Sequence, residues 1–203
     1  SHLEFFGTLK KIVEEKARVV AALSRSGTAV LNYDDEEVRA MAGKNKGKTI
    51  FYSIRDLPFD SPPREEGKGE VIVATNIQFT PDGLAFKLHH EGRVVPVRLP
   101  GALGKPNLYA ALAGAAVGLT MEMNLLEISR GLQNYKSLPG RLGLLPGIKN
   151  TKVIDDTYNA APASMLAALE VLAELPGKRK IAVLGDMAEL GEYTEDGHRK
   201  VGA

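Results

Sequence analysis

Residues 28–53 read TAVLNYDDEEVRAMAGKNKGKTIFYS, and this stretch decides the fold class. Its two ends, 28–31 and 49–53, are short apolar runs that predict two buried strands. The acidic segment between them can cap a short helix over 36–42. Strand, helix and strand in this order predict a parallel βαβ unit, and therefore an α/β protein.

The neighbouring segments extend this unit on both sides. Apolar residues recur at helical spacing over 8–23, which predicts a helix before the first strand. The stretch 55–69 is rich in proline, glycine and charge, so we expect a loop. From 71 to 99 the apolar positions alternate between turn signals, which predicts a three-stranded antiparallel meander with one buried face. Two helices are expected next, over 107–119 and 124–133.

A break at Leu138-Pro139-Gly140 predicts a domain boundary, which divides the chain into 1–138 and 139–203. The second part is expected to contain short strands over 141–146 and 152–154, a helix opened by a proline over 162–174, and a strand over 181–184. These elements predict a second βαβ unit.

Composition excludes several classes of protein. The chain has 203 residues, enough for one to two domains at about 150 residues each, and its net charge of +1 is unlike that of a nucleic-acid binder. It has no cysteine, which excludes disulfide scaffolds and thiol nucleophiles. No apolar run has the length of a membrane helix, and no signal peptide is evident, so we expect a cytoplasmic enzyme. Both ends interrupt a helical pattern, which suggests an excised piece of a longer protein.

Polar side chains follow three of the predicted strands, at the edge where α/β sheets bind ligands. They are Asn32, Asp34 and Asp35 after the first strand, Asp155, Asp156, Tyr158 and Asn159 after another, and Asp186 and Glu189 after a third. Each could instead be a helix cap or turn former. The adjacent carboxylates of Asp155 and Asp156 repel each other, so they need a cation or hydrogen-bond donors nearby.

Lysine and histidine give weaker signals. Lys16 falls among apolar helix positions, and from the residues alone a snorkelling side chain explains it. His89 and His90 lie near a turn of the meander, where we expect a solvated face. No G-x-x-x-x-G-K-[ST] phosphate-binding loop occurs in the chain.

Two long motifs nevertheless resemble a known family. VIDDTYNAAPASMLAALEVLAEL from Val153, followed by IAVLGDMAELGEYTEDGH from Ile181, looks like the Mur ligases, and within them the members that add D-alanyl-D-alanine to UDP-N-acetylmuramoyl tripeptide. The segments HLEFFGTLKKIVEEK, LNYDDEEVRAMA, GKPNLYAALAGAAVGL and LPGRLGLLPG resemble the same family, so the likeness covers essentially the whole chain.

The resemblance implies a fold and a reaction. The fold would be the later part of a P-loop-type ATP-binding central domain, followed by the first part of a Rossmann-like C-terminal domain. The reaction would be amide-bond formation in peptidoglycan precursor synthesis: ATP phosphorylates the peptide carboxylate, and the incoming amine displaces phosphate, with ATP and Mg²⁺ as cofactors. The phosphate-binding loop and the UDP-sugar domain are expected upstream. The fragment alone is therefore expected to be inactive, to bind ATP weakly and to be prone to self-association.

The resemblance also implies residue roles. His2 would bind Mg²⁺, and Lys16 would do so as a carbamate, an oxygen ligand that replaces the snorkelling interpretation. Arg141 would reach the ATP phosphates. ATP contacts are further implied for Asn32, Asn107, Asp155, Asp156, Tyr158 and Asn159, and contacts with the dipeptide substrate for Asp186, Glu189 and His198.

One motif departs from the family pattern, and two alternatives stay open. In the family's His-Asn-x-x-Asn element near the adenine, this chain has Pro106, Asn107 and Ala110, so Asn107 could be a helix cap only. The chain could instead belong to a Mur ligase that adds diaminopimelate or lysine, or to a folylpolyglutamate synthase. It could also be a non-catalytic module derived from a ligase.

Overall fold

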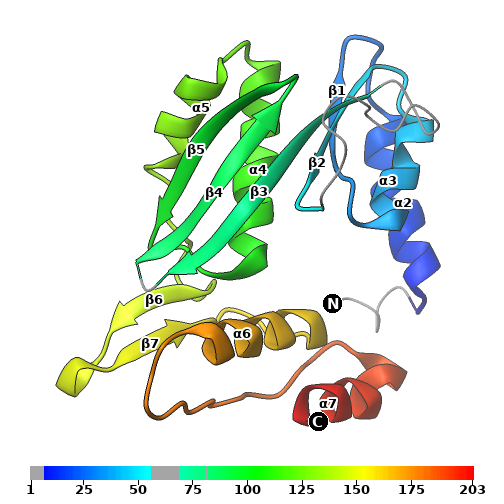
Figure 1. The fold of residues 1–203 in the computed structure, drawn as a ribbon. Coiled ribbons are helices and arrows are strands. Elements are labelled where there is room, and N and C mark those ends of the chain that lie inside the picture. Colours follow the sequence, from blue (N-terminus) through cyan, green and yellow to red (C-terminus); the bar gives the residue numbers. More distant parts are fainter. Residues whose placement is uncertain (1–6, 56–68, 81) are drawn as a thin grey trace.

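The computed structural model describes residues 7–55, 69–80 and 82–203. The predicted loop over 55–69 lies almost wholly outside the described residues, as does Pro81 of the predicted turn between the first two meander strands. Figure 1 shows a twisted sheet flanked by helices, with a smaller layer of strands and helices below it.

The predicted βαβ unit is confirmed, together with the helix before it. Helix α2 (Leu9–Ala21) precedes strand β1 (Thr28–Asn32), which leads through α3 (Glu36–Ala40) and a 3-10 turn, η1 (Met41–Lys44), to strand β2 (Lys48–Ser53). The two strands pair in parallel. Asp35 caps α3, because its side chain accepts a hydrogen bond from the Val38 N–H at 3.0 Å.

The predicted meander is also confirmed, but it does not stand alone. Strands β3 (Gly69–Thr80), β4 (Gly83–His90) and β5 (Arg93–Pro100) pair antiparallel in sequence order. β3 also pairs in parallel with β2, so the βαβ unit and the meander form one mixed sheet in the order β1-β2-β3-β4-β5. Pairing between distant segments leaves no local pattern, which is why the junction was not predicted.

Helices cover the sheet from two sides (Figure 1). Helix α4 (Gly104–Thr120) and helix α5 (Leu125–Leu132) pack on one face, where the main core contains fully buried residues such as Ile72, Leu88 and Leu112. Helix α2 and η1 cover β1 and β2 on the other side through a second cluster that includes Ala17 and Phe51. Neighbouring residues of a strand contribute to different clusters, because successive side chains point to opposite faces of the sheet.

The C-terminal part is smaller. Strand β6 (Gly143–Pro146) and strand β7 (Lys152–Asp155) form an antiparallel pair around a 3-10 turn, η2 (Ile148–Asn150). Helix α6 (Pro162–Glu174) and helix α7 (Thr194–Gly202), with the 3-10 turn η3 (Gly191–Tyr193) between them, complete it. The part rests on α4 through a small cluster of Leu103, Leu142 and Val171, and through the bridge between Ala102 and Gly143.

One predicted strand is wrong. Residues 181–184 form no strand, and Ile181, Val183 and Leu184 are 62%, 92% and 51% exposed. The second βαβ unit is therefore not formed in this chain. An apolar run becomes a strand only where another strand supplies hydrogen-bond partners, and β7 pairs with β6 alone among the described strands.

Candidate functional site

Three backbone hydrogen bonds tie the segment after the predicted boundary to the end of β7. The Gly140 N–H donates to Asp155 Oδ2 and the Leu142 N–H donates to Asp156 Oδ1, both at 3.1 Å. The Tyr158 N–H donates in return to the Gly140 carbonyl, also at 3.1 Å. We call this arrangement of residues 140–142 and 155–158 the clasp. The donors that the two adjacent carboxylates required are thus backbone amides.

Gly140 is the residue that permits the clasp. Its φ of +71° lies in the left-handed region, and a β-carbon there would lie 2.9 Å from the Tyr158 nitrogen. A side chain at this position would therefore be strained and would also push the two segments apart. From the sequence, Pro139-Gly140 predicts a break and a flexible connection between domains, whereas in the structure Gly140 supplies a positive φ.

The two carboxyl groups of the clasp have pKa values that move in opposite directions. The Thr157 hydroxyl donates to Asp155 Oδ1 at 2.7 Å and, with backbone N–H groups, holds the pKa of Asp155 below its ordinary value. Burial raises the pKa of Asp156, although the Leu142 N–H and the Arg141 charge oppose this. The separation reduces the repulsion between the neighbouring groups, because Asp155 holds the negative charge more firmly.

Arg141 is exposed at the rim of the clasp. Its guanidinium lies over the ring of Tyr158, 4.1 Å from the ring centroid, and Tyr158 is itself 70% exposed. The aromatic face supports the guanidinium and leaves its N–H groups available to an anion with two acceptor oxygens, such as a phosphate or a carboxylate. Asn159 is exposed as well, and its side chain accepts a hydrogen bond from the neighbouring Ala160 N–H at 2.9 Å.

A second polar cluster lies where β1 and β2 end. Asp34, with a side chain only 7% exposed, accepts hydrogen bonds from the Ser53 hydroxyl at 2.5 Å, the Ile54 N–H at 2.8 Å and the Tyr109 hydroxyl at 3.0 Å. Arg55 Nε lies 3.5 Å from the same carboxylate. Burial and the charge of Asp34 raise the pKa of Tyr109 far above its ordinary value. Asp34 therefore joins β1, β2 and α4.

Two residues with predicted ATP contacts have internal partners. Asn32 accepts a hydrogen bond from the Asp34 N–H at 3.0 Å and so shapes the turn after β1. Asn107 is buried; its amide donates to the Leu103 carbonyl at 2.8 Å and its oxygen accepts from the Tyr135 hydroxyl at 2.6 Å. These contacts favour the alternative in which Asn107 stabilises the start of α4.

The residues predicted to contact the dipeptide form a third cluster, before and within α7. His198 Nε2 lies 2.6 Å from Asp186 Oδ1, and His198 Nδ1 lies 2.7 Å from the Thr194 carbonyl oxygen. Because both ring nitrogens face acceptors, the protonated imidazolium is favoured and the pKa of His198 is raised. Glu189 is half-buried and has a φ of +62° in the segment that connects Asp186 to α7.

The predicted metal ligands are not brought together among the described residues. His2 lies outside them, and Lys16 is exposed on α2, whereas the buried side of that helix consists of Ala17 and Val20. The expectation that Lys16 lies on an apolar face is therefore wrong. Helical spacing placed it near that face, but the contact with the sheet is narrower than the apolar stripe.

The solvated face expected at His89 and His90 is also wrong. His90 is only 12% exposed and its Nε2 lies 3.3 Å from Glu70 Oε2. His89 is half-buried, with Nε2 2.8 Å from the Thr75 hydroxyl, and burial lowers its pKa. Both partners lie on β3, so the pairing of β3 with β4 creates these contacts.

Sequence reasoning brought together Arg141, Asp155, Asp156 and Tyr158, and the structure joins them in the clasp. It missed Gly140, Thr157, Ser53 and Tyr109. Gly140 had a usable signal, a glycine after a proline at a boundary. Tyr109 had none, because its partner Asp34 is distant in the sequence and the contact depends on how α4 lies against the sheet.

Family models match both parts of the chain. The Mur ligase middle domain matches residues 1–118, and the Mur ligase glutamate ligase domain matches residues 140–203. The chain belongs to the Mur ligase family. This confirms the family that the two long motifs resembled, and the mixed α/β architecture agrees with it.

Two curated relatives of this Mur ligase chain carry the same enzyme name. UDP-N-acetylmuramoyl-tripeptide–D-alanyl-D-alanine ligase of Escherichia coli is 36% identical over 205 residues, which covers 100% of this chain and 42% of the relative. The enzyme of the same name from Haemophilus influenzae is 31% identical over 202 residues, covering 100% of this chain and 41% of the relative. The chain thus spans about two-fifths of the length of these curated relatives.

Solved structures agree with the sequence matches. A crystal structure of MurF from Acinetobacter baumannii superposes with a TM-score of 0.82 at 29% identity, over 100% of this chain and 41% of that one. MurF ligase from Thermotoga maritima, solved in complex with ADP, gives a TM-score of 0.80 at 26% identity, over 100% and 43%. Among the described residues, no helix has the length and apolar character needed to cross a membrane.

Proposed function

We propose that the protein containing this chain is an ATP-dependent ligase that adds D-alanyl-D-alanine to UDP-N-acetylmuramoyl tripeptide in peptidoglycan precursor synthesis. The observation that carries the proposal is the match over 100% of the chain, at 36% identity, to a relative of that name. In this proposal the chain contributes the later part of the ATP-binding middle domain and the beginning of the C-terminal domain.

We place the division between these domains at residues 138 and 139, as the Leu138-Pro139-Gly140 break predicts. The family matches end at 118 and resume at 140, which supports a division between those positions. We also propose that the chain is flexible at this division, as a hinge between the two domains. In this proposal Gly140 and Leu142 move with the C-terminal part, because they are hydrogen-bonded to the end of β7. The pivot therefore lies before Gly140, between the end of α5 and Leu138.

Arg141 is the residue of the clasp best suited to contact ATP. It is exposed, oriented by Tyr158 and near Asp156, so its guanidinium presents free N–H groups beside a carboxyl of raised pKa. In the proposed enzyme the C-terminal part closes about the pivot and brings Arg141 to the nucleotide phosphates. Closure of this kind excludes water from an acyl phosphate.

Mg²⁺ and the carbamylated Lys16 remain part of the proposal for the whole enzyme only. The described residues place no carboxylate or histidine cluster around Lys16; the cluster that could hold a metal ion lies on β3 and β4. The residues present therefore do not build the metal site, and no step proposed for this chain passes through it.

The test uses the complete ligase that contains this chain. Release of phosphate from ATP is measured with UDP-N-acetylmuramoyl tripeptide and, in parallel, with D-alanyl-D-alanine, diaminopimelate, lysine or glutamate as the amine. We expect turnover with D-alanyl-D-alanine alone. Turnover with one of the single amino acids instead would assign the enzyme to another branch of the family, and no turnover with any amine would favour the non-catalytic module.

A matched pair of variants tests the role of Arg141 in that enzyme. Arg141→Lys keeps the charge but cannot stack or bind a phosphate through two N–H groups, so KM for ATP should rise and kcat fall. Arg179, an exposed arginine in the segment after α6, provides the control as Arg179→Lys, which should leave both constants unchanged. Equal behaviour of the two variants would remove Arg141 from the proposal.

A further inference from the structure

Three side chains that can bind metals converge at one end of the sheet, far along the chain from the residues of the clasp. Glu70 lies near the start of β3, His90 ends β4, and Glu91 is the first residue of the turn into β5. One ligand atom from each lies within 4.8 Å of the others. The cluster combines an imidazole with two carboxylates from two paired strands.

The two partly buried members, Glu70 and His90, have the spacing of metal ligands. Glu70 is 32% exposed and His90 12%, and the atoms that face each other, Glu70 Oε2 and His90 Nε2, are 3.3 Å apart. At usual Zn–N and Zn–O bond lengths of about 2.0–2.1 Å, donors 3.3 Å apart subtend about 105° at the metal, close to a tetrahedral angle. A metal there would replace the hydrogen between the two atoms.

Glu70 can bind through that oxygen without losing its other partner. Its Oε1 lies 2.8 Å from Lys48 Nζ, whereas Oε2 faces His90. The lysine orients the carboxylate from the side opposite to the histidine. Ligand groups oriented by a second hydrogen bond are typical of protein metal sites.

The turn brings the third carboxylate to the same side. Adjacent residues of a strand point to opposite faces, so His90 and Glu91 would diverge in regular β structure. Glu91 and Gly92 instead have φ values of +47° and +71°, as in a two-residue hairpin between β4 and β5. Asn, Asp and Gly are the residues favoured at the first position of such a turn. A glutamate with a positive φ has a higher backbone energy there, which is consistent with a role for its side chain.

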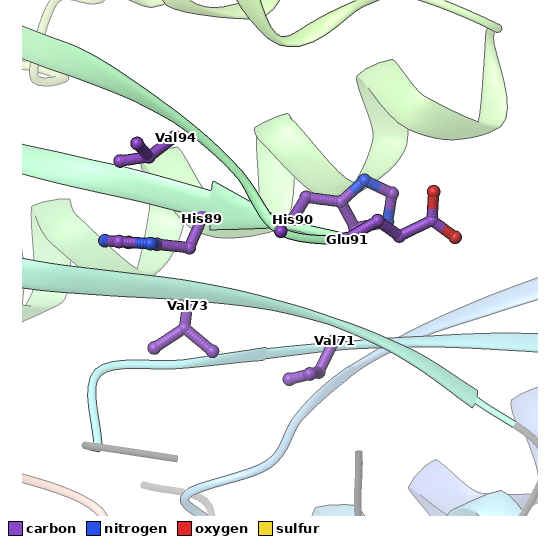
Figure 2. A pocket seen from close by; sticks show the side chains of 7 residues that line it. Val71, Val73, His89, His90, Glu91 and Val94 are labelled. Carbon is purple, nitrogen blue, oxygen red and sulfur yellow. The ribbon is translucent and has the colours of Figure 1, made fainter. Parts of the chain in front are cut away.

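A hollow lies at the same end of the sheet, formed mainly by side chains of the face opposite to Glu70 and His90. It has a volume of about 350 Å³ and is lined by Val71, Val73, His89, His90, Glu91, Gly92 and Val94. Figure 2 shows the ring of His89 between Val94 and Val73, and the side chains of His90 and Glu91 next to each other. Water could reach the cluster itself from the side of Glu91, which is exposed, and complete the coordination of an ion held by the three side chains, as in zinc sites with an open position.

We propose that Glu70, His90 and Glu91 form a binding site for a divalent transition-metal ion, with Zn²⁺ as the ion that fits best. The imidazole selects against Mg²⁺ and Ca²⁺, which prefer oxygen ligands. The site is separate from the residues proposed to contact ATP. Its three residues lie at the end of the sheet where β3 begins and β4 ends, and none belongs to the clasp. Its presence or absence leaves the proposed ligase function unaffected.

The experiment is a titration of the 203-residue chain with ZnCl₂, followed by isothermal calorimetry and by competition with a zinc indicator dye. We expect saturable binding that MgCl₂ in excess does not displace. Glu91→Gln, at an exposed turn position with little effect on folding, should weaken the affinity by at least the roughly 10–100-fold typical of impaired metal sites. His90→Gln should weaken it at least as much.

Two histidine variants serve as controls. His89→Gln alters the same hollow without removing a proposed ligand, and His198→Gln removes the histidine beside Asp186; both should bind Zn²⁺ as the parent does. Substitution with Co²⁺ gives a separate readout, since a four-coordinate site absorbs visible light strongly and a six-coordinate ion weakly. Unchanged Zn²⁺ affinity in Glu91→Gln and His90→Gln, or its loss in either control, would overturn the assignment.

Discussion

The sheet and the C-terminal part bury their apolar residues to very different extents. Over β1–β5 and α4, each predicted strand pairs with another strand and the helix packs on the sheet. The main core there contains many residues with no exposed surface. After Gly140 the clusters are small, with three buried residues each, and the apolar run 181–184 lies at the surface. Periodic sequence is present in both parts. Burial follows only where several elements meet, so the sheet carries most of the stability. The C-terminal part is attached to it through the small cluster of Leu103, Leu142 and Val171 and the bridge between Ala102 and Gly143.

The largest expected effect concerns the main core. Leu112→Ala removes a fully buried side chain from the middle of α4 and should lower the free energy of unfolding by about 2–5 kcal/mol. Met165→Ala, in the small cluster beside α7, should cost less than half as much, because its surroundings can collapse. Urea denaturation of both variants measures the difference. Equal losses would mean that the two parts are equally well packed, contrary to the comparison.

The next effect concerns the buried carboxylate that joins β1, β2 and α4. Asp34→Asn keeps the shape but replaces one acceptor oxygen with a donor, which conflicts with the donors that surround it. A hydrogen bond to a charged group contributes about 1.5–3 kcal/mol, and we expect a loss of that order in unfolding free energy. Tyr109→Phe, which removes a single donor, should lose less. An unchanged free energy of unfolding in Asp34→Asn, measured by urea denaturation, would show that the charge of Asp34 does not stabilise the junction of β1, β2 and α4.

A smaller effect is expected at the clasp. Gly140→Ala forces a β-carbon into a left-handed backbone position 2.9 Å from the Tyr158 nitrogen, and such strain costs about 1–3 kcal/mol. The Leu142 amide should then exchange its hydrogen faster, and proteases should cut sooner between residues 138 and 142. Gly143→Ala is the matched control, because a β-carbon there meets nothing within 4 Å. If both variants behave alike, the clasp does not depend on Gly140.

The smallest effect is a change in titration within the C-terminal part. His198 has a raised pKa, so its contact with Asp186 is fully formed below the unfolded pKa of about 6.5 and is lost as the pH rises through the folded value. Asp186→Asn should lower the pKa of His198, measured by NMR titration of the imidazole protons. Asp196→Asn, an exposed position in the first turn of α7, should not. An unchanged pKa in Asp186→Asn would exclude the carboxylate as its cause.

Local patterns predicted local structure well. The helix over 162–174, the meander and the Asp35 cap were legible because helical spacing, alternation and turn residues are properties of consecutive residues. The same reasoning failed at 181–184, since an apolar run specifies a strand only if a neighbour is available. It also placed Lys16 on an apolar face, although Lys16 is exposed, because helical spacing does not show how much of a helix surface will contact the sheet.

For the candidate site, the sequence by itself determined which groups are present and which family the chain belongs to. Asp155, Asp156 and Tyr158 could be named in advance because they lie in one contiguous motif, and Arg141 because its own segment resembles the family. Tertiary structure alone decided that the two carboxylates bind backbone amides of residues 140 and 142, that Asp34 reaches Tyr109, and that Glu70 meets His90. Each of these contacts joins segments distant along the chain. Their geometry follows from strand pairing and helix packing, which no local pattern encodes.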